Sequence, residues 1–267
     1  MRHNDLVIIR GGGDLATGVA QKFYRSGIPV LILETAKPTT IRTNVALSSA
    51  VYDGATTVED MDAVKISNPE EWKQCFDEGK IPVLVDENCE SVDILKPICV
   101  VDAIISKIGT DTSTKMAPIT IAMGPGFEAG KNVDAVIETM RGHDLGRLIL
   151  KGKAMDDTGV PGEVGGQSLK RVVHAPNEGK VIPYLHIGDV AKRGEPILKV
   201  GNTEVAAPFM GLIRGMIRDG ILVSDGMKIA DIDPRIDVDY TSISDKARCL
   251  GGAVLEAYFY LKRSIKP

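Results

Sequence analysis

A glycine-rich segment near the start of the chain has the residue types and spacing of a phosphate-binding loop. It fits the pattern G-x-G-x-x-A and consists of Gly11, Gly12, Gly13, Asp14, Leu15 and Ala16. Glycines let a backbone approach a pyrophosphate closely, and the amide groups at a helix start supply donors and partial positive charge. Glu34 ends the next apolar run, where a carboxylate accepts hydrogen bonds from a ribose diol in dinucleotide-binding folds. The segment therefore predicts a site for a dinucleotide-type cofactor.

Two charged residues beside this loop leave its interpretation open. Asp14 places a carboxylate at the helix start, where it could cap the helix itself and repel a phosphate. Loops with an acid at this position also occur in NAD-binding sirohaem-forming dehydrogenases, to which this loop is similar. Arg10 ends an apolar run, where a charge is costly unless it meets an anion or forms a salt bridge, for which Asp14 is the nearest candidate. The alternative to nucleotide binding is a glycine turn that only packs a helix on a strand.

A second glycine loop follows the apolar run at residues 119–123. It contains Gly124, Gly126 and Phe127, and we expect it at the carboxyl edge of a sheet, where doubly wound folds place ligands. There it could line the same crevice as the first loop. The alternative is a strand-ending turn that needs a positive φ at glycine.

Three basic residues are candidates for contacts with the anionic groups of a cofactor, namely Arg42, His143 and Arg147. The last two belong to the polar run RGHDLGR, which we interpret as a loop that contacts an anion or a pterin. The alternative for His143 is an ordinary exposed loop histidine. The sequence shows no HExxH motif, P-loop lysine, EF-hand or Ser/His/Asp pattern, so no catalytic residue is assigned. Its four cysteines form no CxxC pair, and no metal site is expected.

The elements that position these residues follow from apolar runs that alternate with helical patterns. We expect buried β-strands at residues 6–9, 29–33, 63–66, 81–85, 98–105, 119–123 and 148–150. Helical patterns span residues 15–24, 69–78 and 132–141. Near-continuous apolar strands between helices indicate a parallel sheet covered on both faces. Residues 1–155 are therefore predicted to form a Rossmann-like, doubly wound α/β domain that binds a nucleotide or cofactor.

The residues that follow change to short strands with regular glycine turns, and they contain an internal repeat. The segment from Ala175 to Ile197 recurs 32 positions later, from Ala207 to Ile229, with its glycines in register. One such unit cannot close its own core, so two are expected to face each other. The pattern resembles the barrel-sandwich fold of biotinyl and lipoyl carrier domains, but the hairpin at residues 201–204 lacks the lysine that those domains modify. Residues 156–240 are therefore predicted to be an unmodified β module for scaffolding or docking.

The C-terminal residues 241–267 have helical spacing of apolar residues behind Ser244, a favourable N-cap. Gly251 and Gly252 lie in the middle of this helix, where each glycine costs about 1 kcal/mol relative to alanine. We therefore expect another backbone to pack closely there. The helix is predicted to pack on the first domain or on a second subunit. In the second case the protein would be a homo-oligomer.

Composition limits the classes of function. The chain has 267 residues, of which 43% are hydrophobic and 25% charged, as is typical of a folded globular protein. Its net charge of −4 gives no electrostatic reason to expect nucleic acid or an anionic membrane as a partner. The start of the chain lacks the apolar stretch of a signal peptide, and no run has the length of a membrane span. We therefore expect a cytoplasmic protein.

Several segments together resemble one protein family. They are VIIRGGGDLATGVAQKFYRSGIPVLILE, IRTNVALSSAVYDG, AMGPGFEAGKNVDAVIETMRGHDLG and the passage from GxPGEVGG to HAPNEGKV. In this order they are similar to the YqeB family of accessory proteins of the selenium-dependent molybdenum hydroxylase system, whose Rossmann part is related to xanthine dehydrogenase accessory proteins. The resemblance implies a maturation factor that handles or inserts a molybdopterin-type cofactor, with selenium involved, into a molybdenum hydroxylase client enzyme. It implies no defined chemical step, so whether the chain is an enzyme stays open.

Two other classes of function use the same glycine loop. An NAD(P)-dependent oxidoreductase acting on a small metabolite would bind its cofactor there, but the sequence shows no clear pair of proton donors for the nicotinamide position. A binding-only sensor would need no client enzyme. The expected ligand is therefore an NAD(P)-like dinucleotide or a molybdopterin cofactor.

Overall fold

The computed structural model describes residues 5–159, 162, 166–167 and 169–265. The chain divides into two compact units. Unit 1 comprises Met1–Pro38, Ala46–Thr158 and Ile243–Pro267, and unit 2 comprises Thr39–Val45 and Gly159–Ser242. Residues 39–45, which our sequence analysis placed in the first domain, are thus part of unit 2. None of the helices in the described ranges is long and apolar enough to cross a membrane.

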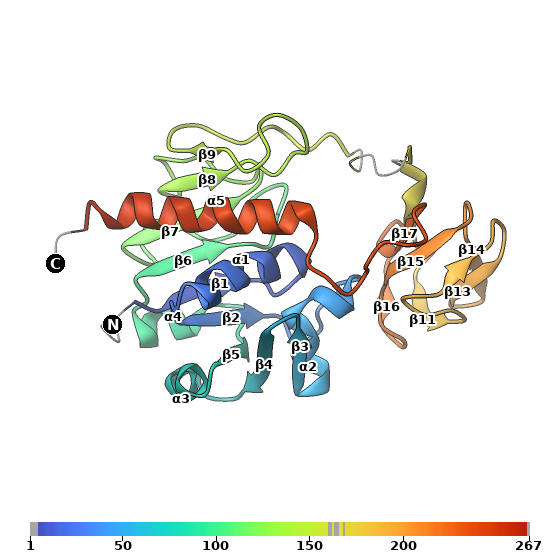
Figure 1. Cartoon of the computed structure of the whole chain (residues 1–267), viewed down its shortest axis with the longest axis horizontal. Helices are drawn as coiled ribbons and strands as arrows, with labels where there is room; N and C mark the ends of the chain where they lie inside the picture. The colour runs from blue at the N-terminus through green and yellow to red at the C-terminus, as the bar shows by residue number, and fades with distance from the viewer. Residues whose placement is uncertain (1–4, 160–161, 163–165, 168, 266–267) are drawn as a thin grey trace. The chain divides into compact units, whose positions relative to one another are not determined.

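Unit 1 is built on a nine-stranded, mostly parallel sheet (Figure 1). Its strands are β1 (Val7–Arg10), β2 (Val30–Glu34), β3 (Ala55–Val58), β4 (Met61–Ile66), β5 (Lys80–Val85), β6 (Cys99–Asp102), β7 (Ile119–Met123), β8 (Ala135–Ile137) and β9 (Leu148–Ile149). The order is β3-β4-β5-β2-β1-β6-β7-β8-β9, and every neighbouring pair from β4 to β8 is parallel. The central order β5-β2-β1-β6-β7-β8 is that of the Rossmann fold, in which ligands bind at the switch point between β1 and β6. The predicted α/β fold class is confirmed.

Helices cover both faces of this sheet. They are α1 (Asp14–Arg25), α2 (Ala50–Asp53), α3 (Trp72–Asp77), α4 (Glu90–Leu95) and α5 (Asp245–Lys262), with short 3-10 turns η2 (Leu47–Ser49) and η3 (Pro69–Glu71). On one face, α3 and α4 supply Trp72 and Val92 to a buried cluster that includes Leu31 and Leu33 of β2. Side chains alternate along a strand, so Ile32 points to the opposite face, where it approaches the loop that begins α1.

In the second half of the sheet, α5 takes the place that crossover helices occupy in the first half. Within the described residues, no helix connects β6 to β7 or β7 to β8, whereas α5 contacts β7, β8 and β9. α5 and α1 run side by side (Figure 1), and a Cβ at Gly251 would lie 2.7 Å from the carbonyl carbon of Gly18. Phe23 and Tyr258 continue this contact edge to face, with ring centroids 5.3 Å apart. The side chain of Ser244 caps α5, as its position predicts.

Two predicted elements differ from the structure. The helix predicted for residues 132–141 is wrong, because the apolar residues there form β8, which pairs with β7 and β9. All three residues of β8 are fully buried. The sequence pattern of a short, fully buried apolar run fits a strand as well as the apolar face of a helix. β6 is shorter than the predicted run 98–105. Its pairing with β1 and β7 ends at Asp102, and Ile105 has φ +61°, a left-handed conformation that a strand excludes.

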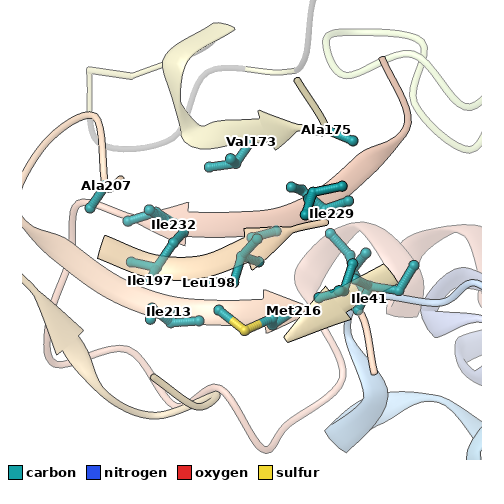
Figure 2. Close-up of a cluster of buried hydrophobic side chains, with 14 of the residues drawn as sticks. Ile41, Val173, Ala175, Ile197, Leu198, Ala207, Ile213, Met216, Ile229 and Ile232 are labelled. Atoms are coloured by element: carbon teal, nitrogen blue, oxygen red, sulfur yellow. The ribbon is translucent and has the colours of Figure 1, made fainter. Parts of the chain in front are cut away.

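Unit 2 consists of two four-stranded antiparallel sheets that follow the internal repeat. Its strands are β10 (Val172–His174), β11 (Gly179–Pro183), β12 (Val190–Ala191), β13 (Pro196–Val200), β14 (Thr203–Ala206), β15 (Gly211–Met216), β16 (Leu222–Val223) and β17 (Lys228–Asp233), with 3-10 turns η1 (Thr43–Val45) and η4 (Leu169–Arg171). The orders are β10-β17-β15-β12 and β14-β13-β11-β16, and a shift of 32 residues relates the two, strand by strand. Each half of the repeat therefore contributes strands to both sheets. Figure 2 shows the shared core, where Ile41 joins Val173, Ile197, Ile213 and Ile229.

Candidate functional site

Four parallel strands of unit 1 end at, or directly before, an ionisable residue at the same edge of the sheet. β1 ends in Arg10 and β6 in Asp102, which are register partners across the switch point. β2 ends in Glu34, and Glu138 directly follows β8. Arg10, Asp102 and Glu138 are each at most 5% exposed. Buried charges are costly unless they are paired, so this carboxyl edge is the candidate site.

The first glycine loop joins β1 to α1 at this edge. Gly11 has φ +91°, a backbone conformation that favours glycine. Gly13 is the N-cap of α1, and Asp14, Leu15 and Ala16 follow as its first turn. Asp14 lies inside the helix and therefore does not act as its N-cap.

Two glycines of this loop lie close to other parts of unit 1. A Cβ at Gly11 would lie 3.5 Å from the carbonyl group of Ala103, directly after β6, so the loop lies at the switch point. A Cβ at Gly12 would lie 2.9 Å from the backbone nitrogen of Ser48, which donates a 2.8 Å hydrogen bond to the Gly12 carbonyl. Gly12 is therefore needed for packing within the chain, whichever ligand the loop binds.

Glu34 holds the glycine loop from the end of β2. Its Oε1 accepts a hydrogen bond from the Gly12 N–H at 2.7 Å, and its Oε2 accepts one from the Thr35 N–H at 2.8 Å. Burial raises the pKa of Glu34 above its ordinary value, and the two backbone donors oppose this shift. Each carboxylate oxygen keeps a lone pair for a second donor, so a ribose hydroxyl can share Glu34 with the loop.

Among the described residues, the ion-pair partners of Arg10 are Asp102 and Asp111, not Asp14. The Arg10 Nη1 lies 2.7 Å from Oδ1 of Asp111 and 3.8 Å from Oδ2 of Asp102. Asp111 lies in the connection from β6 to β7, so this loop folds back over the end of β1. The charge of the buried arginine is thus balanced within unit 1.

Hydroxyl groups hold Asp102 beside this arginine. Thr110 and Thr112 donate hydroxyl hydrogen bonds to its Oδ2 at 2.6 and 2.8 Å, and the Ile104 N–H donates to Oδ1 at 3.2 Å. The sequence alone did not single out Asp102, Thr110 or Thr112. One signal was present, because Asp102 is the single charged residue within the apolar run at residues 98–105. The two threonines carried no signal, since their contact depends on the path of an irregular loop.

The second glycine loop contacts the segment after β6. A Cβ at Gly124, which has φ +88°, would lie 3.4 Å from Cγ2 of Ile105, and Gly126 touches the backbone of Gly109. The segment after β6 therefore contacts both glycine loops. The side chain of Phe127 is 1% exposed and packs among residues of β7 and β8. A ligand at this edge would meet the backbone of the loop rather than this ring.

The loop that carries His143 and Arg147 is tied to the start of α5. Arg141 forms two hydrogen bonds, of 2.8 and 2.7 Å, with the carboxylate of Asp245. This guanidinium group holds the pKa of Asp245 well below its ordinary value. Arg147 pairs with Asp144 of its own loop at 2.6 Å, and His143 is exposed. Contact of His143 or Arg147 with a ligand stays a prediction.

Arg42 belongs to unit 2 and packs against β15. A Cβ at Gly215 would lie 3.1 Å from Cγ of Arg42, and the Ile41 carbonyl accepts a 2.7 Å hydrogen bond from the Met216 N–H. Arg42 is 7% exposed. Its contact with a cofactor stays a prediction.

Two buried aspartates, which the sequence alone did not single out, form ion pairs within unit 2. Asp231 of β17 pairs with Arg171 and Arg214, and Asp233 pairs with Arg214 and Arg235. Arg171 comes from η4 and Arg214 from β15. The pairs therefore tie both elements to β17, a structural role within this unit.

Three of the four cysteines are buried thiols, and Cys249 is exposed. Cys75, Cys89 and Cys99 are buried, and burial raises the pKa of each thiol, that of Cys89 to about 11. A thiol that stays protonated at neutral pH is a poor nucleophile and a poor metal ligand. Within the described ranges, no three His, Cys, Asp or Glu side chains are grouped to hold a metal ion.

Comparison with curated proteins identifies a relative in Escherichia coli (strain K12), the uncharacterized protein YqeB. The two are 49% identical over 259 residues, which cover 97% of this chain and 48% of the relative. The chain thus spans about half the length of that protein. No family model matches the chain.

Two solved structures show only weak similarity. The product-bound ectoine utilization protein EutE (DoeB) from Ruegeria pomeroyi is 12% identical and aligns with 85% of this chain and 57% of its own, with a TM-score of 0.24. A succinylglutamate desuccinylase from Silicibacter sp. TM1040 is 10% identical, with coverages of 86% and 84% and a TM-score of 0.25. Scores this low carry no argument about this chain.

Proposed function

We propose that unit 1 binds a phosphate-bearing nucleotide cofactor at its switch point and that the chain serves as an accessory factor in the maturation of a molybdenum hydroxylase. The first part is carried by one observation. In a sheet with the Rossmann strand order, the glycine loop lies against the switch point, since a Cβ at Gly11 would be 3.5 Å from Ala103. The second part rests on the role that the resemblance to the YqeB family implies, and the 49% identity to the E. coli protein of that name supports the resemblance itself.

The residues at this edge fit a phosphate group. Gly13 is the N-cap of α1 and has no side chain to fill the space before the helix start, where phosphate oxygens accept backbone hydrogen bonds. Glu34 stands at the end of β2, the position from which an acidic residue reaches a ribose in dinucleotide-binding folds. NAD(P)-like dinucleotides and molybdopterin cofactors both carry phosphate, so both belong in the test.

Calorimetric titration of the purified protein with NAD, NADP, AMP and a molybdopterin species tests the binding site. We expect at least one of these ligands to bind and Gly13→Asp to abolish binding, because the variant adds bulk and negative charge where the phosphate must approach. Gly252→Asp is the matched control, since a Cβ at Gly252 meets no atom within 4 Å. If the parent protein binds none of these ligands, the nucleotide site is rejected.

A second experiment tests the role in maturation. Without this protein, the client molybdenum hydroxylase should still accumulate, but its molybdenum content and its activity should fall. A client that carries its full molybdenum content in the absence of this protein would contradict the proposal. Oxidation of NADH by the protein alone with a small carbonyl substrate would instead support the oxidoreductase alternative.

A further inference from the structure

Arg10 has hydrogen-bond donors that the described part of the chain does not satisfy. Its side chain is 6% exposed, and its polar contacts all use one nitrogen, Nη1. That atom meets the hydroxyls of Thr110 and Thr112 at 3.3 and 2.5 Å, Asp111 at 2.7 Å and Asp102 at 3.8 Å. The Nε and Nη2 atoms carry three more N–H donors, and no acceptor among the described residues bonds them. Neither atom is among the fully buried polar atoms that lack a partner in the described residues, so this edge of Arg10 reaches solvent and can receive an external acceptor.

The two carboxylates beside Arg10 differ in their exposure. Asp102 is completely buried and is held by hydroxyl and backbone donors, so it belongs to the fixed framework of the strand ends. The side chain of Asp111 is 64% exposed, yet its carboxylate contacts the buried guanidinium group. The place that Asp111 occupies is therefore open to solvent. An anion from outside can reach this place without disturbing the strands.

The segment that carries Asp111 is held in a strained conformation. Ile105 is β-branched and has φ +61°, a conformation that costs roughly 1–3 kcal/mol and persists only where its surroundings impose it. Ile108 in the same segment is 95% exposed, whereas Thr110 and Thr112, the neighbours of Asp111, are held by hydrogen bonds to Asp102. Among the described residues, the polar contact of the Asp111 side chain is with Arg10, so a rotation of this exposed side chain releases Asp111 while the segment stays in place.

We propose that Arg10 is an anion-binding residue at the switch point and that Asp111 occupies its site as an internal competitor, which the phosphate or pyrophosphate group of a ligand displaces. The end of the guanidinium group, formed by Nη1 and Nη2, presents two parallel N–H donors that match two oxygens of such a group, and Asp111 now occupies the Nη1 side. Arg10 directly precedes Gly11, so the same pyrophosphate can contact the arginine and the start of α1. This role of Arg10 rests on the proposed function, and it assigns the contact with the phosphate groups of the ligand to the last residue of β1.

The test measures the affinity of the whole protein for inorganic pyrophosphate by calorimetry. Asp111→Asn keeps the size of the side chain and removes the competing charge, and it should raise the affinity roughly tenfold, the difference between a charged and a neutral hydrogen bond. Asp60→Asn is the matched control, because it removes an exposed carboxylate that pairs with Arg25 at the same distance of 2.7 Å. This control should leave the affinity unchanged.

A second variant tests whether the gain in pyrophosphate affinity depends on Arg10. Arg10→Lys combined with Asp111→Asn keeps a positive charge but loses the two parallel donors, and it should lose the gain in affinity. Equal affinity of the parent protein and Asp111→Asn would overturn the inference, as would a gain that persists with lysine at position 10.

The nucleotide proposal and this inference can fail separately. If the parent protein binds NAD but Asp111→Asn changes nothing, the competitor role of Asp111 is wrong and the proposed function stands. If no nucleotide binds but pyrophosphate binds Asp111→Asn in a manner that depends on Arg10, the inference stands and the nucleotide assignment is rejected.

Discussion

Replacing Gly251 by alanine should destabilise unit 1, whereas the same replacement at Gly252 should stabilise it. The two glycines are neighbours in α5, and each alanine gains roughly 0.5–1 kcal/mol of helix preference. A Cβ at Gly251 would lie 2.7 Å from the carbonyl carbon of Gly18, and backbone on a packed helix cannot move aside cheaply. A Cβ at Gly252 meets nothing within 4 Å.

The magnitude follows from overpacking. Adding a methyl group to a closely packed contact costs about 1–3 kcal/mol, so Gly251→Ala should lose roughly 0.5–2 kcal/mol of unfolding free energy after its gain in helix preference. Both variants gain the same helix preference. The difference between their free energies of unfolding therefore equals the steric cost of the methyl group at position 251. With a urea dependence of about 2 kcal/mol per molar, the two midpoints should differ by roughly 1 M.

The assay is urea unfolding followed by tryptophan fluorescence. Trp72 is the single tryptophan of the chain, lies in α3 of unit 1 and is 4% exposed, so its emission reports the unfolding of this unit. If Gly251→Ala stabilised unit 1 as much as Gly252→Ala does, the close approach of α5 to α1 would be refuted.

Three further predictions concern other parts of the chain. Gly12→Ala should destabilise unit 1 by about 1–3 kcal/mol in the same assay, because the added Cβ would lie 2.9 Å from the Ser48 nitrogen; an unchanged midpoint would exclude this contact. Arg141 lowers the pKa of Asp245 in the folded state, so the pair stabilises the fold above the ordinary aspartate pKa of about 3.9, and this stability is lost as the pH falls through the lowered pKa. Asp245→Asn should therefore cost at most about 1 kcal/mol at pH 7 and less below pH 4, and urea titrations with an equal loss at both pH values would contradict this linkage. Intact-mass measurement of native protein should show no biotin or lipoate, because the β13–β14 hairpin has no lysine at its turn; an added prosthetic mass would overturn that reading.

Most strands of the parallel sheet could be predicted because their signal is local. The run at residues 119–123 matches β7 residue for residue, and the glycines after β1 mark the turn into α1. The helix predicted at residues 132–141 failed because the three buried residues of β8 carry no polar face from which a period could be read. This segment is a strand because it pairs with β7 and β9. Pairing with strands outside the segment leaves no periodic pattern within the segment itself.

The candidate site was only partly visible in the sequence. Arg10, Gly13 and Glu34 could be singled out, since each ends or follows an apolar run at a recognised spacing. Asp111 could not, because it lies in an irregular loop about a hundred residues from the arginine that it contacts. Loops have no period, so the partner of a buried charge is found only when the chain is folded.

The sequence by itself determined the α/β class, the glycine loop before the first helix and the repeat that builds unit 2, because periodicity and glycine spacing are properties of neighbouring residues. Only the tertiary structure decided that α5 covers β7, β8 and β9, that residues 39–45 belong to unit 2 and that Arg10 is paired with Asp102 and Asp111. These features depend on contacts between segments far apart in the chain. Such contacts form wherever burial and pairing of charge are most favourable for the whole fold, and no local preference encodes them.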